Sequence, residues 1–336
     1  MKSFEITEFG IDKLTIRDVE VPRPGPGEAL VRLQAASLNY RDLMVVQGTY
    51  NPKLKRPMVP LSDGCGVVED VGAGVTRVKA GDRVAPCFFQ TWIDGPPSRE
   101  KFAAALGGGI AGVLREYAVF REEGLVHAPE ILTSEEVACL PCAGVTAWHA
   151  LFEHTNMAPG GSVLIQGTGG VSTFALLFAK AAGFRTIVTS GSDEKLGRVR
   201  DSGASHVINY REHPDWEEQA RTLTGGRGVD NVIEVGGSDT LSKSFRAART
   251  GGAVSVIGVL SGRDTGPGPG QILVSSLRVQ GIYVGSRAMF ERMNQAIEFH
   301  NIKPVIDRVF AWTDFPEALR YMEAQKHFGK ICLKFT

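Results

Sequence analysis

The first third of the chain contains short runs in which apolar residues either cluster or alternate with polar ones. Such runs cover residues 14–18, 28–33, 66–71 and 82–86, and prolines and glycines separate them. Alternation with a period of two is typical of β-strands, and proline and glycine mark the turns between strands. The pattern therefore predicts a compact, β-rich domain of antiparallel, barrel-like form.

From about residue 133 the pattern changes to short apolar segments that alternate with helical ones. Thr133, which precedes Ser-Glu-Glu, is typical of a helix start. Residues 162–166 predict a strand, and residues 171–182 predict a helix that ends at Gly183. Further strands are predicted at residues 185–189, 206–210, 231–235, 253–257 and 281–285, and the tail from residue 288 predicts a helix, a strand, a second helix and a closing strand. Six strands alternating with helices predict an α/β fold with a doubly wound parallel sheet.

One long irregular segment interrupts the β-rich part of the chain. It covers residues 90–114 and contains paired prolines and three consecutive glycines. Loops of this length inside a compact domain are often functional. The segment from Phe89 to Leu114, with its aromatic residues Phe89, Trp92 and Phe102, is a candidate substrate lid, and a packed surface excursion is the equally weighted alternative.

The bulk composition narrows the classes of function. A chain of 336 residues is long enough for two domains, and its 37 basic and 37 acidic side chains cancel. This balance argues against a nucleic-acid partner, which requires a basic excess. No apolar run approaches the roughly 20 residues that cross a bilayer, so we expect no membrane partner. Five cysteines in so long a chain do not suggest a disulfide framework, which favours a cytoplasmic, reducing location.

A glycine-rich turn lies between the predicted strand at residues 162–166 and the helix that follows it. Gly167 permits the tight turn, and Gly169, Gly170 and Val171 lead into the helix, whose first amides can bind a pyrophosphate. Ser172 replaces the usual third glycine of this motif. Because the turn sits in a strand–loop–helix–strand unit of about 30 residues, it indicates a dinucleotide-binding site.

The end of the second strand predicts which dinucleotide binds. An NAD site places an acid there, whereas this strand ends in Ser190, Gly191 and Ser192, and Asp193 has the position of a helix cap. Ser190, Lys195 and Tyr210 can instead bind a 2′-phosphate, with Arg198 and Arg211 as further nearby cations. The alternative is that these cations are ordinary surface charges. The missing acid favours NADPH over NADH.

Several segments in the same order resemble the medium-chain dehydrogenase/reductase superfamily over nearly the full length of the chain. These segments cover residues 27–32, 66–72, 78–84, 140–147, the glycine-rich turn and 327–331. The resemblance implies a GroES-like catalytic domain formed by residues 1–127 and 287–336, and a Rossmann domain formed by residues 128–286. It also implies an active site in the cleft between the domains, a small-molecule substrate and a homodimer or homotetramer.

The zinc members that the chain resembles carry Cys, His and Cys as catalytic ligands. The corresponding positions here are Asn39, Ser62 and Cys142, and residues 90–115 lack the four cysteines of the structural zinc site. One thiolate cannot hold zinc, so we predict no metal. Cys139 and Cys142 form a C-x-x-C sequence, which we interpret as a buried, inert thiol pair.

Without the zinc ligands, the chain looks more like the quinone oxidoreductase branch of the superfamily, which is similar at Asn39, Asp42 and Tyr50. This resemblance implies contacts to the nicotinamide end of the cofactor from Asn39 and Thr146. It implies a further cofactor-lining set: Val235, Gly236, Gly258, Val259, Val284, Ser286 and Lys330. For Lys330, a plain surface position is the alternative.

A metal-free site favours hydride transfer from NADPH to a quinone or an α,β-unsaturated carbonyl, because conjugation already delocalises the developing charge. Candidate catalytic residues are Asn39, Tyr40, Arg41 and Tyr50, either as donors to the oxyanion or, for the tyrosines, as proton sources. Three alternatives stay open: an alcohol dehydrogenase or ketone reductase, a 2-enoyl-thioester reductase, and an NADPH-binding protein with little catalysis.

Overall fold

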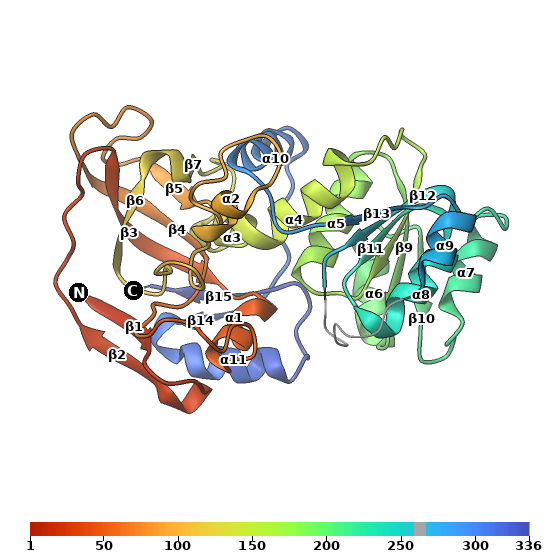
Figure 1. Cartoon of the computed structure of the whole chain (residues 1–336), viewed down its shortest axis with the longest axis horizontal. Coiled ribbons are helices and arrows are strands. Elements are labelled where there is room, and N and C mark those ends of the chain that lie inside the picture. The colour runs from red at the N-terminus through yellow and green to blue at the C-terminus, as the bar shows by residue number, and fades with distance from the viewer. Residues whose placement is uncertain (259–266, 336) are drawn as a thin grey trace. The chain divides into compact units, whose positions relative to one another are not determined.

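The computed structural model describes residues 1–258 and 267–335, and its contacts divide the chain into two compact units. Unit 1 comprises Met1–Val145 and Val284–Thr336, and unit 2 comprises Thr146–Tyr283 (Figure 1). The expected boundary at residue 128 differs from this division. Residues 128–145 lie in unit 1 because helix α3 (Ser134–Ala138) contacts strands of that unit.

Strand β3 (Glu28–Ser37) is the centre of the unit 1 sheet. One edge of β3 pairs with β4 (Asp63–Val71). The other edge pairs with β6 (Tyr117–Arg121) along residues 28–32 and with β15 (Lys330–Lys334) along residues 35–37. The sheet is completed by β14 (Ile306–Ala311), β5 (Arg83–Pro86) and β7 (Leu125–His127), and β1 (Lys2–Ile6) pairs with β2 (Leu14–Asp18) separately. All these pairings are antiparallel except β14 with β15, which confirms the predicted β-rich domain.

The helices of unit 1 are short apart from α10 (Arg287–His300). At α3 the Thr133 hydroxyl accepts a hydrogen bond from the Glu136 N–H, while the Glu136 carboxylate accepts one from the Thr133 N–H, as the predicted helix start requires. The other helical segments are η1 (Ile11–Lys13), α1 (Tyr40–Val46), α2 (Arg99–Ala103), η2 (Glu122–Gly124), η3 (Leu140–Gly144), η5 (Trp312–Asp314) and α11 (Phe315–Glu323).

Unit 2 contains a six-stranded parallel sheet in the order β10-β9-β8-β11-β12-β13. Renumbered within the unit this order is 3-2-1-4-5-6, which is the Rossmann order. The strands are β8 (Ser162–Gln166), β9 (Arg185–Ser190), β10 (His206–Asn209), β11 (Val229–Glu234), β12 (Ala248–Val256) and β13 (Arg278–Gly281). The predicted doubly wound sheet is confirmed, although its last strand ends at Gly281 and not at residue 285.

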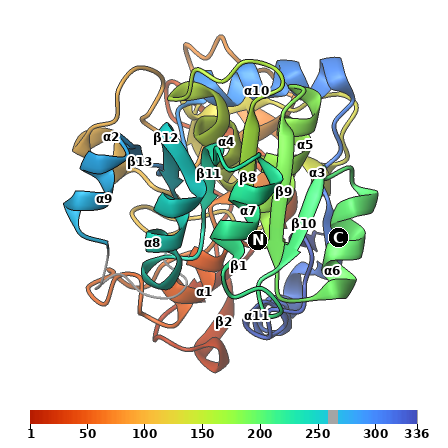
Figure 2. The ribbon, with the colours of Figure 1, turned by 90° about the vertical axis from the view of Figure 1, so that its right-hand side faces the viewer.

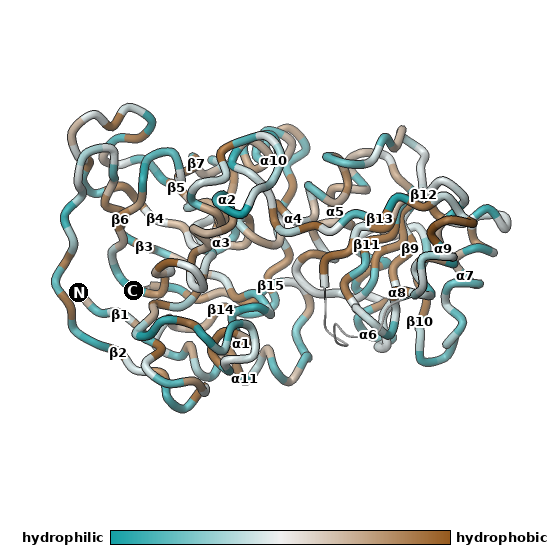
Figure 3. Tube along the Cα trace, viewed as in Figure 1, coloured by the Kyte–Doolittle hydropathy of each residue, from teal (hydrophilic) through white to brown (hydrophobic). Residues whose placement is uncertain are grey.

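Helices cover both faces of this sheet (Figure 2). Helices α7 (Trp216–Leu223) and α8 (Ser238–Ala247) share a core with Leu164, Ile187 and Val232 of the sheet. Helices α5 (Gly170–Ala181) and α6 (Asp193–Asp201) contact strands β8, β9 and β10, and α4 (Val145–Trp148), η4 (His149–Glu153) and α9 (Pro269–Val274) complete the unit. The central strands are brown in Figure 3, as expected for strands buried on both faces.

The irregular segment from Phe89 to Leu114 is largely packed into unit 1. Phe89 and Trp92 are each 1% exposed, and their rings contact Phe102. The carbonyls of Trp92 and Ile93 accept hydrogen bonds from the first two amides of α10, at 2.9 and 3.0 Å. Residues 94–97, by contrast, are exposed. The start of the segment is therefore packed into unit 1, while its tip and residues 99, 100, 103, 109 and 110 are exposed.

No helix within residues 1–258 and 267–335 combines the length and the apolar character needed to cross a membrane.

Candidate functional site

The glycine-rich turn of unit 2 has the geometry of a phosphate-binding loop. Gly167, directly after β8, has a φ of +71°, which favours glycine, and its N–H donates to the Thr189 carbonyl at 2.8 Å. Gly169 precedes α5 in extended conformation, and a Cβ there would meet nothing within 4 Å. Gly170 and Val171 begin the helix and are half-buried. The backbone of this turn and the first amides of α5 therefore offer open space to an anion.

Ser172 replaces the third glycine of the motif by bonding back to the strand. Its hydroxyl donates to the Gln166 carbonyl at 2.6 Å, and the residue is 4% exposed. A small hydrogen-bonding side chain therefore takes the position where the motif needs close packing of helix on strand.

The ends of β9 and β10 bring together most of the residues expected at the 2′-phosphate. Ser190 lies opposite Asn209, and its Oγ accepts a hydrogen bond from the Ser192 N–H at 3.3 Å. A Cβ on Gly191 would lie 2.8 Å from the Tyr210 Oη and 2.9 Å from the Arg211 Nε. Gly191 thus lets the exposed Tyr210 side chain and the Arg211 guanidinium approach the strand end.

Ser192, and not Asp193, caps helix α6: its Oγ accepts from the Lys195 N–H at 3.4 Å. The Asp193 carboxylate instead accepts from the Asn209 Nδ2 at 2.8 Å. The helix cap is therefore Ser192, one residue before the expected Asp193. Lys195 lies in the first turn of α6 and is half-buried.

A buried carboxylate, Glu234, lies at the end of β11 and was not predicted from the sequence. It is 0% exposed, yet its two oxygens accept hydrogen bonds from five donors. The donors are the Gly236 N–H (2.7 Å), the Gly237 N–H (3.0 Å), the Gln166 Nε2 (2.8 Å), the Thr240 Oγ1 (2.7 Å) and the Ser244 hydroxyl. These donors compensate for the loss of water around a buried charge.

Glu234 and Gln166 together join two loops that the sequence assigned to the cofactor. Gln166 directly precedes Gly167, and its Oε1 accepts from the Val235 and Gly236 N–H groups, each at 3.2 Å. Gly258, another expected cofactor residue, packs against the backbone of Val235, so closely that a Cβ on it would lie 1.9 Å from the Val235 carbonyl oxygen. The network therefore sets the glycine-rich turn and the turn after β11 relative to each other. Val259 lies outside the described residues.

In unit 1 Asn39 contacts two buried ionisable residues, Lys330 through its side chain and Asp42 through its backbone N–H. The Lys330 Nζ donates to the Asn39 Oδ1 and to the Leu38 carbonyl, each at 2.7 Å, and the Asn39 N–H donates to the Asp42 Oδ2 at 2.7 Å. Lys330 is 3% exposed, which corrects the alternative that it is a surface residue. Burial raises the pKa of Asp42 to about 6, against the opposing effects of Arg41 and the Asn39 N–H.

The other two positions that correspond to zinc ligands are joined through Asp63. The Ser62 hydroxyl donates to the Asp63 Oδ1 at 2.6 Å, and the Cys142 N–H donates to the Asp63 Oδ2 at 3.1 Å. Burial and the Asp63 charge raise the pKa of the Cys142 thiol far above its usual range. A zinc ion needs a thiolate and neutral imidazoles, whereas these positions hold a thiol, a hydroxyl and an amide bound to an ammonium.

The residues of this site consequently do not fit a zinc ion. Across the described residues, no group of three or more His, Cys, Asp or Glu side chains has an arrangement suited to a metal.

The three remaining candidate catalytic residues differ in their surroundings. The Arg41 Nη2 donates to the Leu106 carbonyl at 2.6 Å, and its guanidinium lies over the rings of Phe88 (4.3 Å) and Tyr50 (5.7 Å). Tyr50 is half-buried against the unit 1 core. Tyr40, the first residue of α1, is 39% exposed. Arg41 thus anchors α1 to the irregular segment, while Tyr40 is open to solvent.

The other expected cofactor residues lie near the two points where the chain passes between the units. Thr146 is 3% exposed in α4, Val284 is 4% exposed with a φ of +53°, and Ser286 caps α10 by accepting from the Met289 N–H at 3.2 Å. Their expected contacts to a cofactor stay predictions.

Both cysteines of the C-x-x-C sequence are free thiols, as expected; Cys139 is buried and Cys142 is half-buried. Cys139 faces Cys332 of β15, with their Sγ atoms 3.4 Å apart, and both are buried. Cys142 lies in η3 (Leu140–Gly144), which begins two residues after the end of α3.

Comparison with known proteins agrees with this fold and site. Residues 25–130 match the model of the alcohol dehydrogenase GroES-like domain, and residues 170–300 match that of zinc-binding dehydrogenases. A zinc-type alcohol dehydrogenase-like protein of Schizosaccharomyces pombe is 46% identical over 333 residues, covering 97% of this chain and 96% of the relative. The chain belongs to the medium-chain dehydrogenase/reductase superfamily. It is therefore an oxidoreductase by family, with a GroES-like domain and a Rossmann domain.

Other members of the superfamily match almost as completely. A putative alcohol dehydrogenase structure from Sinorhizobium meliloti superposes with a TM-score of 0.93 at 42% identity, covering 99% of this chain and 98% of that one. The quinone oxidoreductase of Rattus norvegicus is 30% identical over 91% of this chain and 92% of its own length.

Two further solved members are described together with a cofactor. An NAD-dependent alcohol dehydrogenase superposes with a TM-score of 0.90 at 32% identity, and a mycobacterial protein complexed with NADPH superposes with a TM-score of 0.82 at 26% identity; each match covers 99% of both chains. The family and the turn at Gly167 thus support binding of a pyridine nucleotide by this oxidoreductase.

We predict that Glu234→Gln weakens the binding of pyridine nucleotide roughly tenfold, because the amide would turn an NH2 group toward existing donors. The Kd for NADP⁺ and NAD⁺, measured by calorimetry, checks this. Asp230→Asn is the matched control, because Asp230 is a buried carboxylate on the same strand that binds Arg249 and Ser162. It should lower Tm and leave the nucleotide Kd unchanged. An equal loss of affinity in both variants would show general destabilisation and contradict the role assigned to Glu234.

Proposed function

We propose that this oxidoreductase is a zinc-independent, NADPH-dependent reductase that transfers hydride to a quinone or an α,β-unsaturated carbonyl. The observation that carries the proposal is the set of contacts at the three zinc-ligand positions. Lys330 bonds to Asn39, Ser62 bonds to Asp63, and Cys142 stays a thiol. These positions offer a zinc ion neither a thiolate nor an imidazole, so we expect a substrate that needs little help from a Lewis acid.

A conjugated acceptor meets that condition. NADPH supplies the hydride. When a quinone or enone accepts it, negative charge spreads onto an oxygen that is already conjugated, so hydrogen-bond donors can stabilise it without a metal. The Asn39 amide is one such donor. Tyr40, being exposed, is the better placed of the two tyrosines to deliver a proton, since Tyr50 packs against the core. The 30% identity to a quinone oxidoreductase also supports this substrate class.

The preference for NADPH rests on the ends of β9 and β10. Ser190, Tyr210 and Arg211 meet around Gly191, whereas Asp193 is engaged by Asn209. A hydroxyl, a phenol and a guanidinium suit a phosphate, and no carboxylate takes the place of the ribose-binding acid at the end of β9. The NADPH complex of a relative supports the choice, while the NAD-dependent relative makes it worth testing directly.

Reduction of simple ketones is the second candidate, and the alcohol dehydrogenase names among the relatives favour it. For the location, we propose the cytoplasm, because all five cysteines of the chain are free thiols, as a reducing compartment allows.

A homodimer is the proposed assembly. The edge strand β13 pairs on one side with β12, and all four of its residues are exposed. Leu273 and Val274 on the neighbouring helix α9 are 79% and 83% exposed, and α9 is brown in Figure 3. An open edge beside exposed apolar side chains is a surface that a second copy can cover about a two-fold axis.

The first expected result is oxidation of NADPH, faster than that of NADH, with a quinone or an enone as acceptor. A chelator should leave the rate unchanged, and a simple ketone should react far more slowly. The measurement is the loss of absorbance at about 340 nm under initial-rate conditions. Preference for a ketone with loss of activity in chelator would support the second candidate. Tight NADPH binding without turnover would support a binding protein.

Ser190→Asp should shift the ratio of kcat/KM for NADPH to that for NADH roughly tenfold toward NADH, because a carboxylate repels a 2′-phosphate and accepts from ribose hydroxyls. Ser202→Asp, near the far end of α6, adds the same charge as a control and should leave the ratio unchanged. An unchanged ratio in Ser190→Asp would remove Ser190 from the phosphate site.

The double variant Leu273→Asp/Val274→Asp should convert the dimer to a monomer, because charges cannot be buried at an apolar contact. Sedimentation velocity measures this. Phe299→Asp is the control, since Phe299 is equally exposed (84%) but lies on α10. A wild type that sediments as a monomer would rule out the proposed assembly.

A further inference from the structure

Lys330 determines how the amide of Asn39 is oriented. A lysine ammonium has three donors and no acceptor, so only the carbonyl oxygen of an amide can face it. The Lys330 Nζ lies 2.7 Å from the Asn39 Oδ1, and the Leu38 carbonyl accepts a second bond from it at the same distance. The backbone N–H of Asn39 is held by Asp42. With Oδ1 toward the ammonium, the Nδ2 donors of Asn39 must point away from it.

Those Nδ2 donors have no acceptor within the described residues. The Nδ2 atom is inaccessible to solvent and makes no hydrogen bond there. Leaving a buried donor unpaired is unfavourable, so such groups are normally satisfied. An amide donor calls for an oxygen acceptor, and the lysine beside it disfavours a cationic ligand.

The buried ammonium is itself held in place by its surroundings. Strand β15 pairs with β3 so that Cys332 lies opposite Ser37, and the Leu38 N–H donates to the Ile331 carbonyl at 3.0 Å. This register brings Lys330 beside Asn39. Gly329, directly before it, has a φ of +85°, and a Cβ there would lie 2.3 Å from the Val305 carbonyl oxygen. The sheet therefore fixes the backbone from which the Lys330 side chain reaches the amide.

We propose that Lys330 is a positioning residue: it locks the Asn39 amide so that Nδ2 donates to a carbonyl oxygen of the bound reactants. Two sources supply such an oxygen, the carboxamide of the nicotinamide ring and the carbonyl of the acceptor. The proposal rests on the proposed reductase function and adds a role for Lys330 that does not require contact between the lysine and a ligand.

The test uses the full-length chain with Lys330→Met, which keeps the length of the side chain and removes the donors, and Asn39→Asp, which keeps an acceptor for Lys330 and removes the Nδ2 donors. Calorimetry measures the Kd of NADP⁺ and of 2′-phospho-ADP-ribose, which lacks the nicotinamide ring. Initial rates give kcat/KM for the quinone. Lys330→Arg, which can still donate to Oδ1, serves as the conservative rescue.

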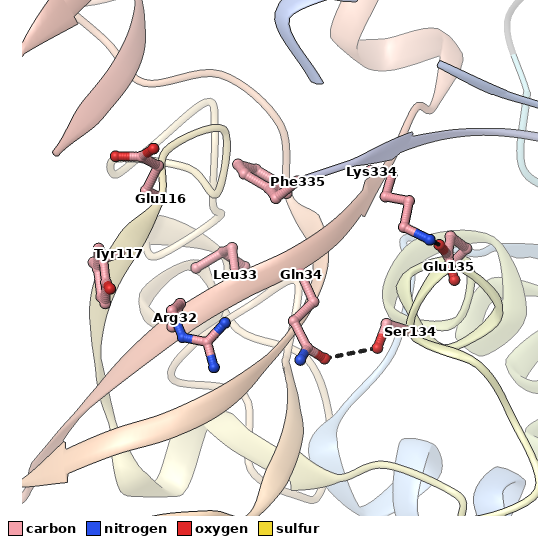
Figure 4. Close-up of a pocket in the computed structure, with 9 residues that line it drawn as sticks. All are labelled: Arg32, Leu33, Gln34, Glu116, Tyr117, Ser134, Glu135, Lys334 and Phe335. Atoms are coloured by element: carbon pink, nitrogen blue, oxygen red, sulfur yellow. Dashed lines mark hydrogen bonds and ion pairs between the residues drawn. The ribbon is translucent and has the colours of Figure 1, made fainter. Parts of the chain in front are cut away.

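Lys334 provides the matched control on the same strand. It is exposed, and its Nζ lies 3.3 Å from the Glu135 carboxylate in a separate pocket of about 500 Å³ (Figure 4). In that pocket the Ser134 hydroxyl already donates to Gln34 at 2.8 Å. Lys334→Met makes the same chemical change as Lys330→Met, four residues further along β15, and should leave both nucleotide affinities and the rates unchanged.

If the oxygen belongs to the cofactor, Lys330→Met and Asn39→Asp should each weaken NADP⁺ roughly tenfold and leave 2′-phospho-ADP-ribose unchanged. If it belongs to the acceptor, both nucleotides should bind as in the wild type while kcat/KM for the quinone falls roughly tenfold. Either pattern, restored by Lys330→Arg, supports the proposal.

The proposal is overturned if Lys330→Met matches the wild type where Asn39→Asp does not, or if both nucleotides lose affinity equally, which would indicate a purely structural role. If Lys330→Met does not fold, an Asn39→Asp variant with wild-type affinities and rates would overturn it as well. A wild type that neither binds NADP⁺ nor reduces the quinone would instead contradict the proposed function.

Discussion

The pairing of the last strand with β3 is the contact on which the catalytic unit depends. Residues 330–334 come from the end of the chain and complete a sheet whose centre is formed by residues 28–37. The same pairing buries an ammonium group beside Asn39 and brings Cys332 against Cys139. Burying a lysine is costly unless acceptors surround it, and here two oxygens at 2.7 Å do so. The backbone register thus decides which buried side chains contact Asn39 and Cys139.

Much of the fold follows from local sequence, because its signals act over a few residues. The cap at Thr133, the glycine-rich turn at Gly167 and the alternation of strands with helices each depend on neighbours in the chain, and the structure has them where they were predicted. The cap of α6 moved by one residue because serine and aspartate are both good caps, and only the fold shows that Asn209 engages Asp193.

The contacts of the site could not be predicted in this way, because they join residues far apart in sequence. Glu234 looks like an unremarkable acid in the run Asn231-Val-Ile-Glu-Val, yet it collects donors from Gln166, Thr240 and Ser244. From the sequence, Lys330 could equally be a cofactor-lining residue or a surface residue, because its partner Asn39 is 291 residues away. The C-x-x-C spacing likewise gave no sign that Cys139 lies against Cys332, 193 residues further along the chain. In each case the missing information is tertiary: which strand end meets which loop.

The division of the chain also has a consequence for its biosynthesis. Unit 2 is continuous from Thr146 to Tyr283, so all six strands of its sheet have been translated before the last 53 residues. Unit 1 is interrupted, and β3 lacks one neighbour until β15 has been translated. Domains generally fold as units during synthesis. The nucleotide-binding half can therefore form during synthesis, whereas the sheet of unit 1 cannot be completed before residues 330–334 have been translated.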